Sequence, residues 1–446
     1  MAACTTVQPI EFIHNLRFEE LPPDVVAIAK RCLLDLVGVA ASGVQTQLSR
    51  IARDFAVGQM GTAGSGVRII FDGRRAGPTG AAYAGASTID AFDGHDGHRL
   101  TKGHAGVALL PALLAFAEGP KRLDGCEFIA ALVLGYETAI RAGIALHATT
   151  LDYHTSGAWN ALGCAAIGAR VLQLDENVTR HALGIAEYHG PRSQMMRCID
   201  YPTMVKDGSG WGALAGVSAA CLAADGFTGA PALLIESEAA APVWSDLGRQ
   251  WEIGRQYFKP HPVCRWAQPA MQAVANLMAQ YQPAREDIVS IEIRTFAEAV
   301  RLGTRLPRNT EEAQYAIGFP VAAIVARGQI GVAELGDAGL NDPNVQEMLR
   351  RIRLVENKSF SDRFPQERLA IVGIEMKNGE RLVSPPTAAR GDPEDALPDR
   401  EMLSKFRMLA TGLSPGRRSA IEQSVSALDS DRDALSALMD AVLAPV

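Results

Sequence analysis

The sequence predicts a mainly α fold, in which a large helical domain is followed by a smaller α+β domain. Apolar residues recur at three- and four-residue spacing as far as about residue 260. Strand-like alternation begins only after that point. The 446 residues also exceed the roughly 250–300 at which a single hydrophobic core usually stops growing. We therefore expect two domains, with the change of character near residue 265.

The first strong element is a helix whose start and stop are both visible in the sequence. Pro22 and Pro23 suit its first turn, Asp24 favours the positive end of the helix dipole, and Gly43 ends it. Asp35 falls among apolar residues of this helix, and we expect a structural, salt-bridged carboxylate there. Further helices, rich in Ala and Gly, are predicted at 80–91, 105–117, 123–148, 155–174, 178–190 and 208–224.

The second domain is predicted from its strands. Residues 289–295 alternate apolar and polar side chains, as in a half-buried strand. Residues 369–376 and 380–384 flank Asn378-Gly379, a strong hairpin signal because both residues tolerate positive φ. Residues 311–328 are predicted to form one helix. From Arg400 the chain returns to helical patterns, and this tail is expected to pack on the helical domain.

Bulk composition excludes several classes of protein. The net charge of −7 argues against a nucleic-acid binder. The seven cysteines are scattered without a CxxC pair, which is neither a disulfide framework nor a zinc pattern. The first 15 residues lack the basic and apolar regions of a signal peptide, and 208–224 is shorter than a membrane span. A cytoplasmic protein that does not bind membranes is the expectation.

The candidate chemistry is concentrated in a polar loop that leads into the apolar run 105–117. A loop held by a buried helix can deliver reactive side chains into a cleft, and His104 directly precedes that helix. We expect His104 to act as a general acid or base, and His95 to be a solvated loop residue. A metal site remains the alternative, although no two ligands have the His-x-x-x-His spacing. The titratable groups are Asp90, Asp93, His95, Asp96, His98, Lys102 and His104.

Three further segments carry candidate groups. Tyr153 and His154 precede a small-residue helix whose free amides attract carboxylates, although His154 is equally consistent with a core histidine bonded to backbone. Lys206 opens a buried Gly/Ala helix, where desolvation would lower its pKa and make it a base; otherwise it is a surface lysine paired with its neighbour. The proline-stiffened segment around His261 provides cations for carboxylates, or else serves only as a rigid linker.

In these segments the sequence resembles the MmgE/PrpD family, which includes 2-methylcitrate dehydratases, cis-aconitate decarboxylases and iminodisuccinate epimerase. The resemblance runs nearly end to end, through LPPDVVAIAKRCLLDLVGVAASG, His104-Ala105-Gly106, Tyr153-His154-Thr155, KPHPVCR and Gly391-Asp392-Pro393-Glu394. It implies an all-helical domain of residues 1–264, completed by helices in 400–446, and an α+β lid of residues 265–399. It also implies an active site between the two, a homodimer and no obligatory cofactor or metal.

Carried over residue by residue, the resemblance places Asp93, His104, His154 and Lys206 on the family's active-site positions, and His98 near a hydroxyl-bearing one. Two departures bear on function. Gln268 stands where dehydratase- and decarboxylase-like members carry a histidine, and Phe319 stands near the expected lid tyrosine, with Tyr315 close by. Because Gln and Phe cannot transfer protons, these departures favour an enzyme that only inverts a carbon α to a carboxylate.

We therefore predict a cofactor-independent isomerase, an epimerase acting on a polycarboxylate such as iminodisuccinate. The predicted catalytic residues are His104, His154, Lys206, Asp93 and Tyr153, and the predicted substrate-binding residues are His98, Lys259, His261, Arg265 and Gln268. A lyase that dehydrates or decarboxylates a tricarboxylate such as 2-methylcitrate or cis-aconitate is the alternative. A metal-dependent hydrolase built on the polar loop is the third hypothesis.

Overall fold

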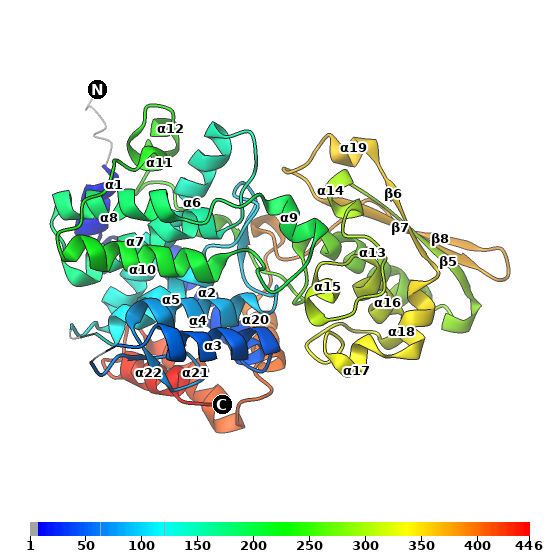
Figure 1. Cartoon of the computed structure of the whole chain (residues 1–446). Coiled ribbons are helices and arrows are strands. Elements are labelled where there is room, and N and C mark those ends of the chain that lie inside the picture. The colour runs from blue at the N-terminus through cyan, green and yellow to red at the C-terminus, as the bar shows by residue number, and fades with distance from the viewer. Residues whose placement is uncertain (1–7, 63, 120) are drawn as a thin grey trace.

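The computed structural model describes residues 8–446 except 63 and 120, and its fold is mainly α (Figure 1). Residues 1–7 lie outside the described residues. They begin the predicted first domain and the segment in which no signal peptide was predicted. Figure 1 shows a larger helical body and, beside it, a smaller body that carries a sheet. The helices of the larger body up to residue 244 are α1 (Pro9–Asn15), α2 (Pro23–Gly43), α3 (Gln47–Gln59), α4 (Pro78–Asp90), α5 (Gly106–Ala117), α6 (Gly125–Thr149), α7 (Gly157–Leu172), α8 (Glu176–His189), α9 (Met195–Asp200), α10 (Ser209–Ala224), α11 (Leu233–Glu236) and α12 (Ala241–Trp244).

Small residues allow the central helices of this body to approach one another closely. Helix α10 packs against α7, α4 and α8, and α7 also packs against α6 and α5. A Cβ on Gly212 would lie 2.6 Å from the carbonyl oxygen of Gly157, and one on Gly216 would lie 2.3 Å from that of Ala161. The Ala- and Gly-rich patterns are therefore needed for helix contact, not for flexibility.

Four short strands in this body were not predicted, so the expectation of a purely helical domain was too simple. They form two antiparallel pairs, β1 (Val67–Arg68) with β2 (Arg75–Ala76) and β3 (Gly97–His98) with β4 (Gln256–Tyr257). The second pair ties the polar loop to the segment that leads into the smaller body. Two-residue strands leave too little alternation to be recognised from sequence.

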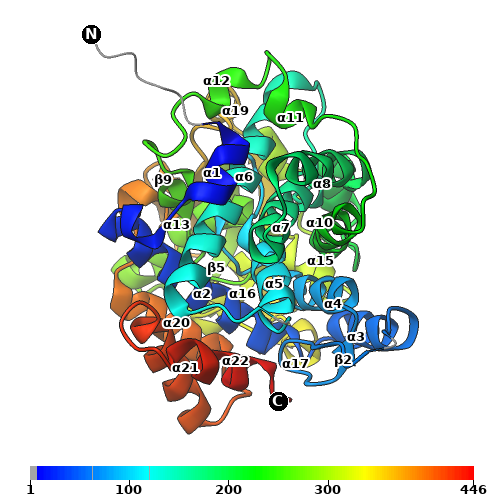
Figure 2. The ribbon, with the colours of Figure 1, turned by 90° about the vertical axis from the view of Figure 1, so that its left-hand side faces the viewer.

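The C-terminal tail returns to the helical body, below α2 in Figure 2. Helices α20 (Asp399–Leu409), α21 (Pro415–Ala427) and α22 (Ala434–Leu443) make this tail, and α20 and α21 contact α2. The Nζ of Lys405 lies 2.5 Å from Asp35 Oδ1 and donates to the carbonyl oxygen of Gly94 at 2.6 Å. The prediction that Asp35 is a structural, salt-bridged carboxylate is confirmed.

The smaller body is built on a five-stranded sheet. The strand order is β6-β5-β7-β8, with β9 beside β7; β5 and β6 are parallel and the other pairs antiparallel. The predicted strand and hairpin are confirmed, with Gly379 at φ +85° in the turn. Its elements are α13 (Gln268–Tyr281), β5 (Ile288–Thr295), α14 (Ala297–Val300), α15 (Thr310–Gln314), α16 (Gly318–Arg327), α17 (Asp337–Leu340), α18 (Pro343–Leu349), β6 (Ile352–Glu356), α19 (Lys358–Ser361), β7 (Leu369–Met376), β8 (Arg381–Val383) and β9 (Thr387–Ala388).

The helix predicted across 311–328 is wrong in one respect, because the chain breaks it at Tyr315–Ile317 into α15 and α16. Pro320, near the start of α16, lacks the N–H that would bond back across the break. The break matters for function because it turns Gln314 and Tyr315 toward the larger body.

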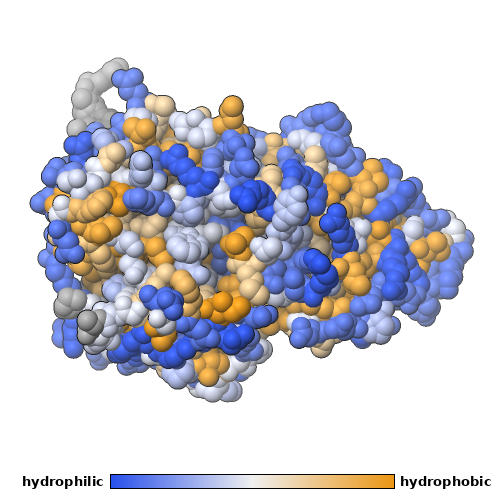
Figure 3. All heavy atoms as spheres, in the orientation of Figure 1, coloured by the Kyte–Doolittle hydropathy of each residue, from blue (hydrophilic) through white to orange (hydrophobic). Residues whose placement is uncertain are grey.

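Helix α6 is long and apolar enough to cross a membrane by length and composition, but 94% of its most apolar window is buried inside the protein. It therefore has the character of a core helix. Apolar side chains on the face shown in Figure 3 are interspersed with hydrophilic ones over both bodies.

Candidate active site

The polar loop between α4 and α5 is packed inside the protein. Asp93, His95, Asp96 and His98 are each no more than 2% exposed. The expectation that His95 is a solvated loop residue is therefore wrong. Pairing of β3 with β4 and burial by the following helix account for this enclosure. The strand pairing gave no local sequence signal.

Asp93 forms the centre of the cluster. Its carboxylate pairs with the Lys259 ammonium, and its backbone N–H donates to Gln314 Oε1 at 2.8 Å. Burial alone would raise the pKa of Asp93, but Lys259 and the neighbouring histidines outweigh it and hold the pKa well below the usual range. Asp93 is thus a fixed negative charge rather than a proton donor.

His104 stands beside this charge in a defined tautomer. Its Nδ1 lies 2.6 Å from the carbonyl oxygen of Asp96, which only accepts, so Nδ1 carries the proton. Its Nε2 lies 3.7 Å from Asp93 Oδ1. Burial and the Lys259 charge lower the pKa of His104 well below its usual value. The resting imidazole is neutral, with the Nε2 lone pair available to take a proton.

Neighbouring residues fix both the backbone and the ring of His104. The N–H of His104 donates to Ser156 Oγ at 2.9 Å, and Ser156 in turn donates to Asp207. A Cβ on Gly97 would lie 2.5 Å from the hydroxyl of Tyr257 and 2.7 Å from His104 Nδ1. Glycine is needed here so that the Tyr257 ring can pack against the imidazole.

A metal site remains geometrically conceivable at Asp93, His95 and His104, because one ligand atom from each lies within 4.8 Å of the others. The rings of His95 and His104 are 4.4 Å apart. However, the Lys259 ammonium already neutralises Asp93, and a dication would have to displace it or sit beside it. The donor set therefore fits a metal poorly.

Lys206 reaches the cluster from the start of α10. Its backbone has φ +48°, its side chain is buried, and its Nζ donates to Gln314 Oε1 at 2.7 Å. The same Nζ lies 4.7 Å from the centre of the Tyr315 ring. Tyr315 thus supplies a phenol at the site, while Phe319 is buried in α16. A functional role for Tyr315, which lies close to the expected lid position, remains a prediction.

Tyr153 and His154 lie next to this cluster but not within it. The N–H of His154 donates to His147 Nε2 at 3.1 Å, and no contact among the described residues joins its ring to Asp93 or His104. Burial lowers the pKa of His154. The hydroxyl of Tyr153 is buried without a protein partner, and Lys102 Nζ lies 4.6 Å from its ring centre. Catalytic roles for both residues remain predictions.

The other predicted substrate-binding residues, like Lys259, have protein partners. His98 Nε2 lies 3.1 Å from Glu252 Oε2, and His261 Nδ1 donates to the carbonyl oxygen of Ile330 at 3.1 Å. The Gln268 amide donates to two backbone carbonyls. Arg265 pairs with Asp392 at 2.8 Å and donates to the carbonyl oxygens of residues 389 and 390. Substrate contact by these four would require the existing bonds to be exchanged, and it remains a prediction.

Sequence reasoning missed Gln314, Tyr257, Ser156 and Arg368. None of them carries a motif, and each is brought to the site by tertiary packing. Gln314 sat inside a helix that was predicted to be continuous.

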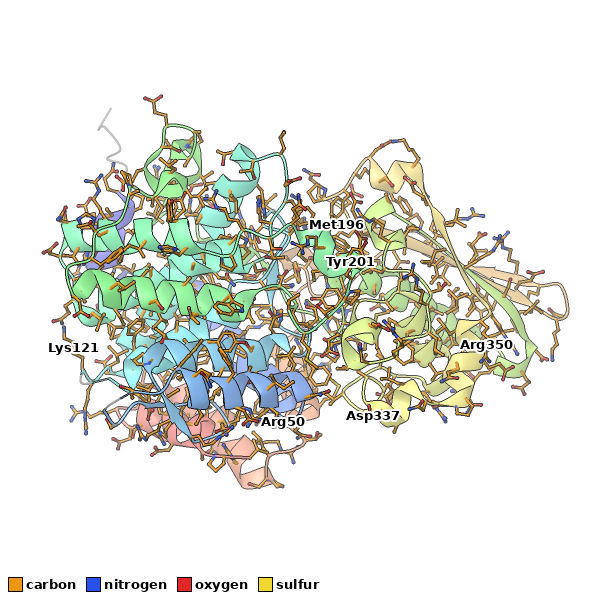
Figure 4. All side chains as sticks on the ribbon, in the orientation of Figure 1. Arg50, Lys121, Met196, Tyr201, Asp337 and Arg350 are labelled. Atoms are coloured by element: carbon orange, nitrogen blue, oxygen red, sulfur yellow. The ribbon has the colours of Figure 1, made fainter. Side chains whose placement is uncertain are left out.

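A groove of about 820 Å³ opens where the two bodies meet, and Tyr315 is among its lining residues. Figure 4 places Tyr201 of the loop after α9 at this junction, and Tyr201 also lines the groove. Arg301 of the smaller body pairs with Asp200 of α9 across it.

Comparison with known proteins decides the family. Residues 9–252 match the MmgE/PrpD N-terminal domain and residues 261–430 match the MmgE/PrpD C-terminal domain. The chain belongs to the MmgE/PrpD family. It is 25% identical to a cis-aconitate decarboxylase-like protein, oryM, of Aspergillus oryzae, over 96% of this chain and 95% of that protein.

Other relatives carry the same activity in their names. The chain is 23% identical to cis-aconitate decarboxylase of Aspergillus terreus, over 99% of this chain and 96% of the relative. It is 24% identical to the human cis-aconitate decarboxylase, over 90% and 86%. These names point to a lyase, so the prediction of an isomerase is wrong. Nothing in the comparisons supports an iminodisuccinate epimerase.

Proposed function

We propose that this protein is a lyase that decarboxylates a tricarboxylic acid of the cis-aconitate type. The observation that carries the proposal is His104, a buried neutral imidazole whose Nε2 lies 3.7 Å from the Asp93 carboxylate, which itself pairs with the Lys259 ammonium. Relatives named cis-aconitate decarboxylase, matched over nearly the whole chain, supply the substrate class. The site itself supplies the acid–base group and the cations.

The chemistry requires a proton at one carbon. When the carbon–carbon bond to a carboxylate breaks, carbon dioxide leaves and the electron pair shifts into the adjacent unsaturated system. A carbon of that system must then be protonated. A bound polycarboxylate brings negative charge next to His104, which raises its proton affinity. His104 then takes up a proton on Nε2 and delivers it to the carbon, while Asp93 stabilises the imidazolium.

The buried lysines Lys206 and Lys259 have a separate role in this proposal. Among the described residues, Lys206 Nζ donates only to the neutral Gln314 amide oxygen, so it can exchange that bond for a substrate carboxylate. Lys259 neutralises Asp93 and keeps the site from repelling an anion. In this account the smaller domain acts as a lid, and Tyr315 on it meets the substrate beside Lys206.

Incubation of the protein with cis-aconitate and with 2-methylcitrate tests the proposal. Carbon dioxide release from the unsaturated acid, with one solvent deuterium entering the product in D₂O, is the expected result. Loss of water without carbon dioxide would instead establish a dehydratase, which a neutral His104 acting as a base also fits. If the protein releases neither carbon dioxide nor water from any tricarboxylate, the proposal is overturned.

The protein is further proposed to work as a cytoplasmic homodimer. Phe55, Tyr83 and Trp211 form an aromatic row on α3, α4 and α10, with ring centres 5.9 and 5.6 Å apart. Trp211 is 52% exposed, and exposed aromatic groups of this size are typical of interfaces. We expect the wild type to sediment as a dimer and Trp211→Ser to sediment as a monomer. Identical sedimentation profiles for the two proteins would contradict this interface.

A further inference from the structure

The buried cations of this protein fall into two groups. Most have a carboxylate within ion-pair distance: Lys259 with Asp93, Lys405 with Asp35, Arg141 with Glu137 and Asp246, and Arg265 with Asp392. This is expected, because a buried charge is strongly unfavourable unless it is paired. The paired cations therefore have a structural explanation within the chain.

Arg368 has no such explanation. Its side chain is only 8% exposed, yet no carboxylate pairs with it among residues 8–446 apart from 63 and 120. One nitrogen donates to the carbonyl oxygen of Arg99 at 3.3 Å, while Nε and the remaining terminal nitrogen have no hydrogen-bond partner. The guanidinium thus keeps unused N–H groups on Nε and on one terminal nitrogen, which a carboxylate can accept.

Arg368 lies against the active-site cluster. It immediately precedes β7 of the smaller domain, and its guanidinium carbon is 5.5 Å from the centre of the Tyr257 ring. The Tyr257 ring in turn packs edge-on against His104, with centres 6.3 Å apart. One aromatic ring therefore separates the unused donors from the acid–base histidine.

Two further polar groups, on Lys102 and Tyr153, lie in the same region as Arg368. Lys102 has no carboxylate in ion-pair distance in the described part of the chain, and its Nζ lies over the ring of Tyr153 at 4.6 Å. The Tyr153 hydroxyl is buried without a partner. Burial, and then the positive charge of Arg368, lowers the pKa of Lys102, while burial raises the pKa of Tyr153 against the effect of Arg368; the Glu298 carboxylate acts on both groups. The three groups therefore share one electrostatic environment.

We propose that Arg368, with Lys102 and the Tyr153 hydroxyl, forms a second carboxylate subsite that selects tricarboxylates and is completed by the smaller domain. It rests on the proposed function, and it takes the substrate carboxylate that Lys206 does not hold. Because Arg368 belongs to the smaller domain and Lys102 to the larger, a carboxylate bound between them links the two bodies. Acids that lack this carboxylate lose both the ion pair and the link.

Calorimetric titration with two unreactive acids tests the subsite. Tricarballylate and glutarate share one carbon skeleton and differ by a single carboxylate. The wild type is expected to prefer tricarballylate, and Arg368→Met is expected to weaken tricarballylate binding by about 100-fold. Glutarate affinity should fall much less, since its two carboxylates can use the remaining cations. Equal losses for both acids, no loss, or no tricarballylate binding by the wild type would each overturn the proposal.

Two controls separate binding from structure. Arg353→Met removes an exposed arginine of the same domain, paired with Glu292, and should leave both affinities unchanged. Arg368→Met should unfold no earlier than the wild type without ligand, because it removes an unpaired buried charge; early unfolding would assign Arg368 a structural role and contradict the subsite. Arg368→Lys, which keeps the charge but not the fork, should show intermediate tricarballylate affinity.

The outcome is distinguishable from that of the proposed function. Carbon dioxide release from cis-aconitate is measured separately on the wild type. Selective loss of tricarballylate in Arg368→Met without any decarboxylation would retain the subsite and reject the reaction. Decarboxylation by the wild type, with Arg368→Met keeping the wild-type preference for tricarballylate, would retain the reaction and reject the subsite.

Discussion

Lys405 and Lys206 are both buried lysines, and they differ in what faces the ammonium. Lys405 donates to the Asp35 carboxylate at 2.5 Å and to a backbone carbonyl. Lys206 donates to the neutral amide of Gln314 and lies over an aromatic ring. A paired buried lysine joins the C-terminal tail to α2, whereas an unpaired one remains able to bind an anion. In the proposed function, the missing partner, rather than burial, distinguishes the lysine that binds substrate.

The largest effect expected from this comparison is on stability at the paired site. Lys405→Met leaves Asp35 buried without a partner and should lower the free energy of unfolding by about 3–5 kcal/mol. Lys206→Met strands no carboxylate and should change it by less than about 1 kcal/mol. Denaturant unfolding of both variants measures the difference. Equal losses would show that the distinction between paired and unpaired lysines is false.

Replacement of the acid–base group comes next. His104→Gln keeps a side chain able to bond the Asp96 carbonyl but cannot transfer a proton, so the turnover number should fall by about 10²–10⁴-fold. The variant should unfold like the wild type. A variant that retains most of its turnover would remove His104 from the reaction.

The third effect separates binding from chemistry at the unpaired lysine. Lys206→Met should reduce kcat/KM for the tricarboxylate by about 100-fold through the loss of a buried charge-assisted contact. Lys121→Met, a change at a lysine that donates to Gln173 and a backbone carbonyl away from the site, is the matched control and should leave kcat/KM unchanged. A comparable loss in both variants would contradict a specific role for Lys206.

The smallest effect is a pH dependence of stability that arises beside the site. Burial, and then the neighbouring Asp90, raise the pKa of Asp207 from its usual 3.8 to about 7. Between these values the folded protein holds a proton that the unfolded chain has released, so the contribution of Asp207 to stability falls as the pH rises from about 4 to about 7. Asp207→Asn should flatten that decline in thermal unfolding curves. An unchanged slope would mean that Asp207 is ionised throughout.

The sequence predicts the elements better than it predicts the site. The strand β5, the hairpin at Gly379 and the structural role of Asp35 follow from periodicity, turn chemistry and an isolated carboxylate in an apolar helix. These are local signals. Asp93, His104, Lys206 and Lys259 were singled out from the sequence, and the structure brings them together.

What the sequence did not reveal depends on tertiary packing. The break that brings the Tyr315 ring to Lys206 interrupts an otherwise regular helical pattern, so the sequence did not reveal this contact. Arg368 stands in an unremarkable stretch before a strand. In the described part of the chain it has no carboxylate at ion-pair distance, a feature that only the fold shows.

The central claim is that the unpaired buried cations receive the carboxylates of the substrate. A crystal structure of the protein with bound tricarballylate tests it most directly. We predict one carboxylate at Lys206 Nζ and a second at the guanidinium of Arg368, with the remainder of the acid beside His104. Tricarballylate held only in the outer groove, with Lys206 still bonded to Gln314 and Arg368 unliganded, would contradict the account.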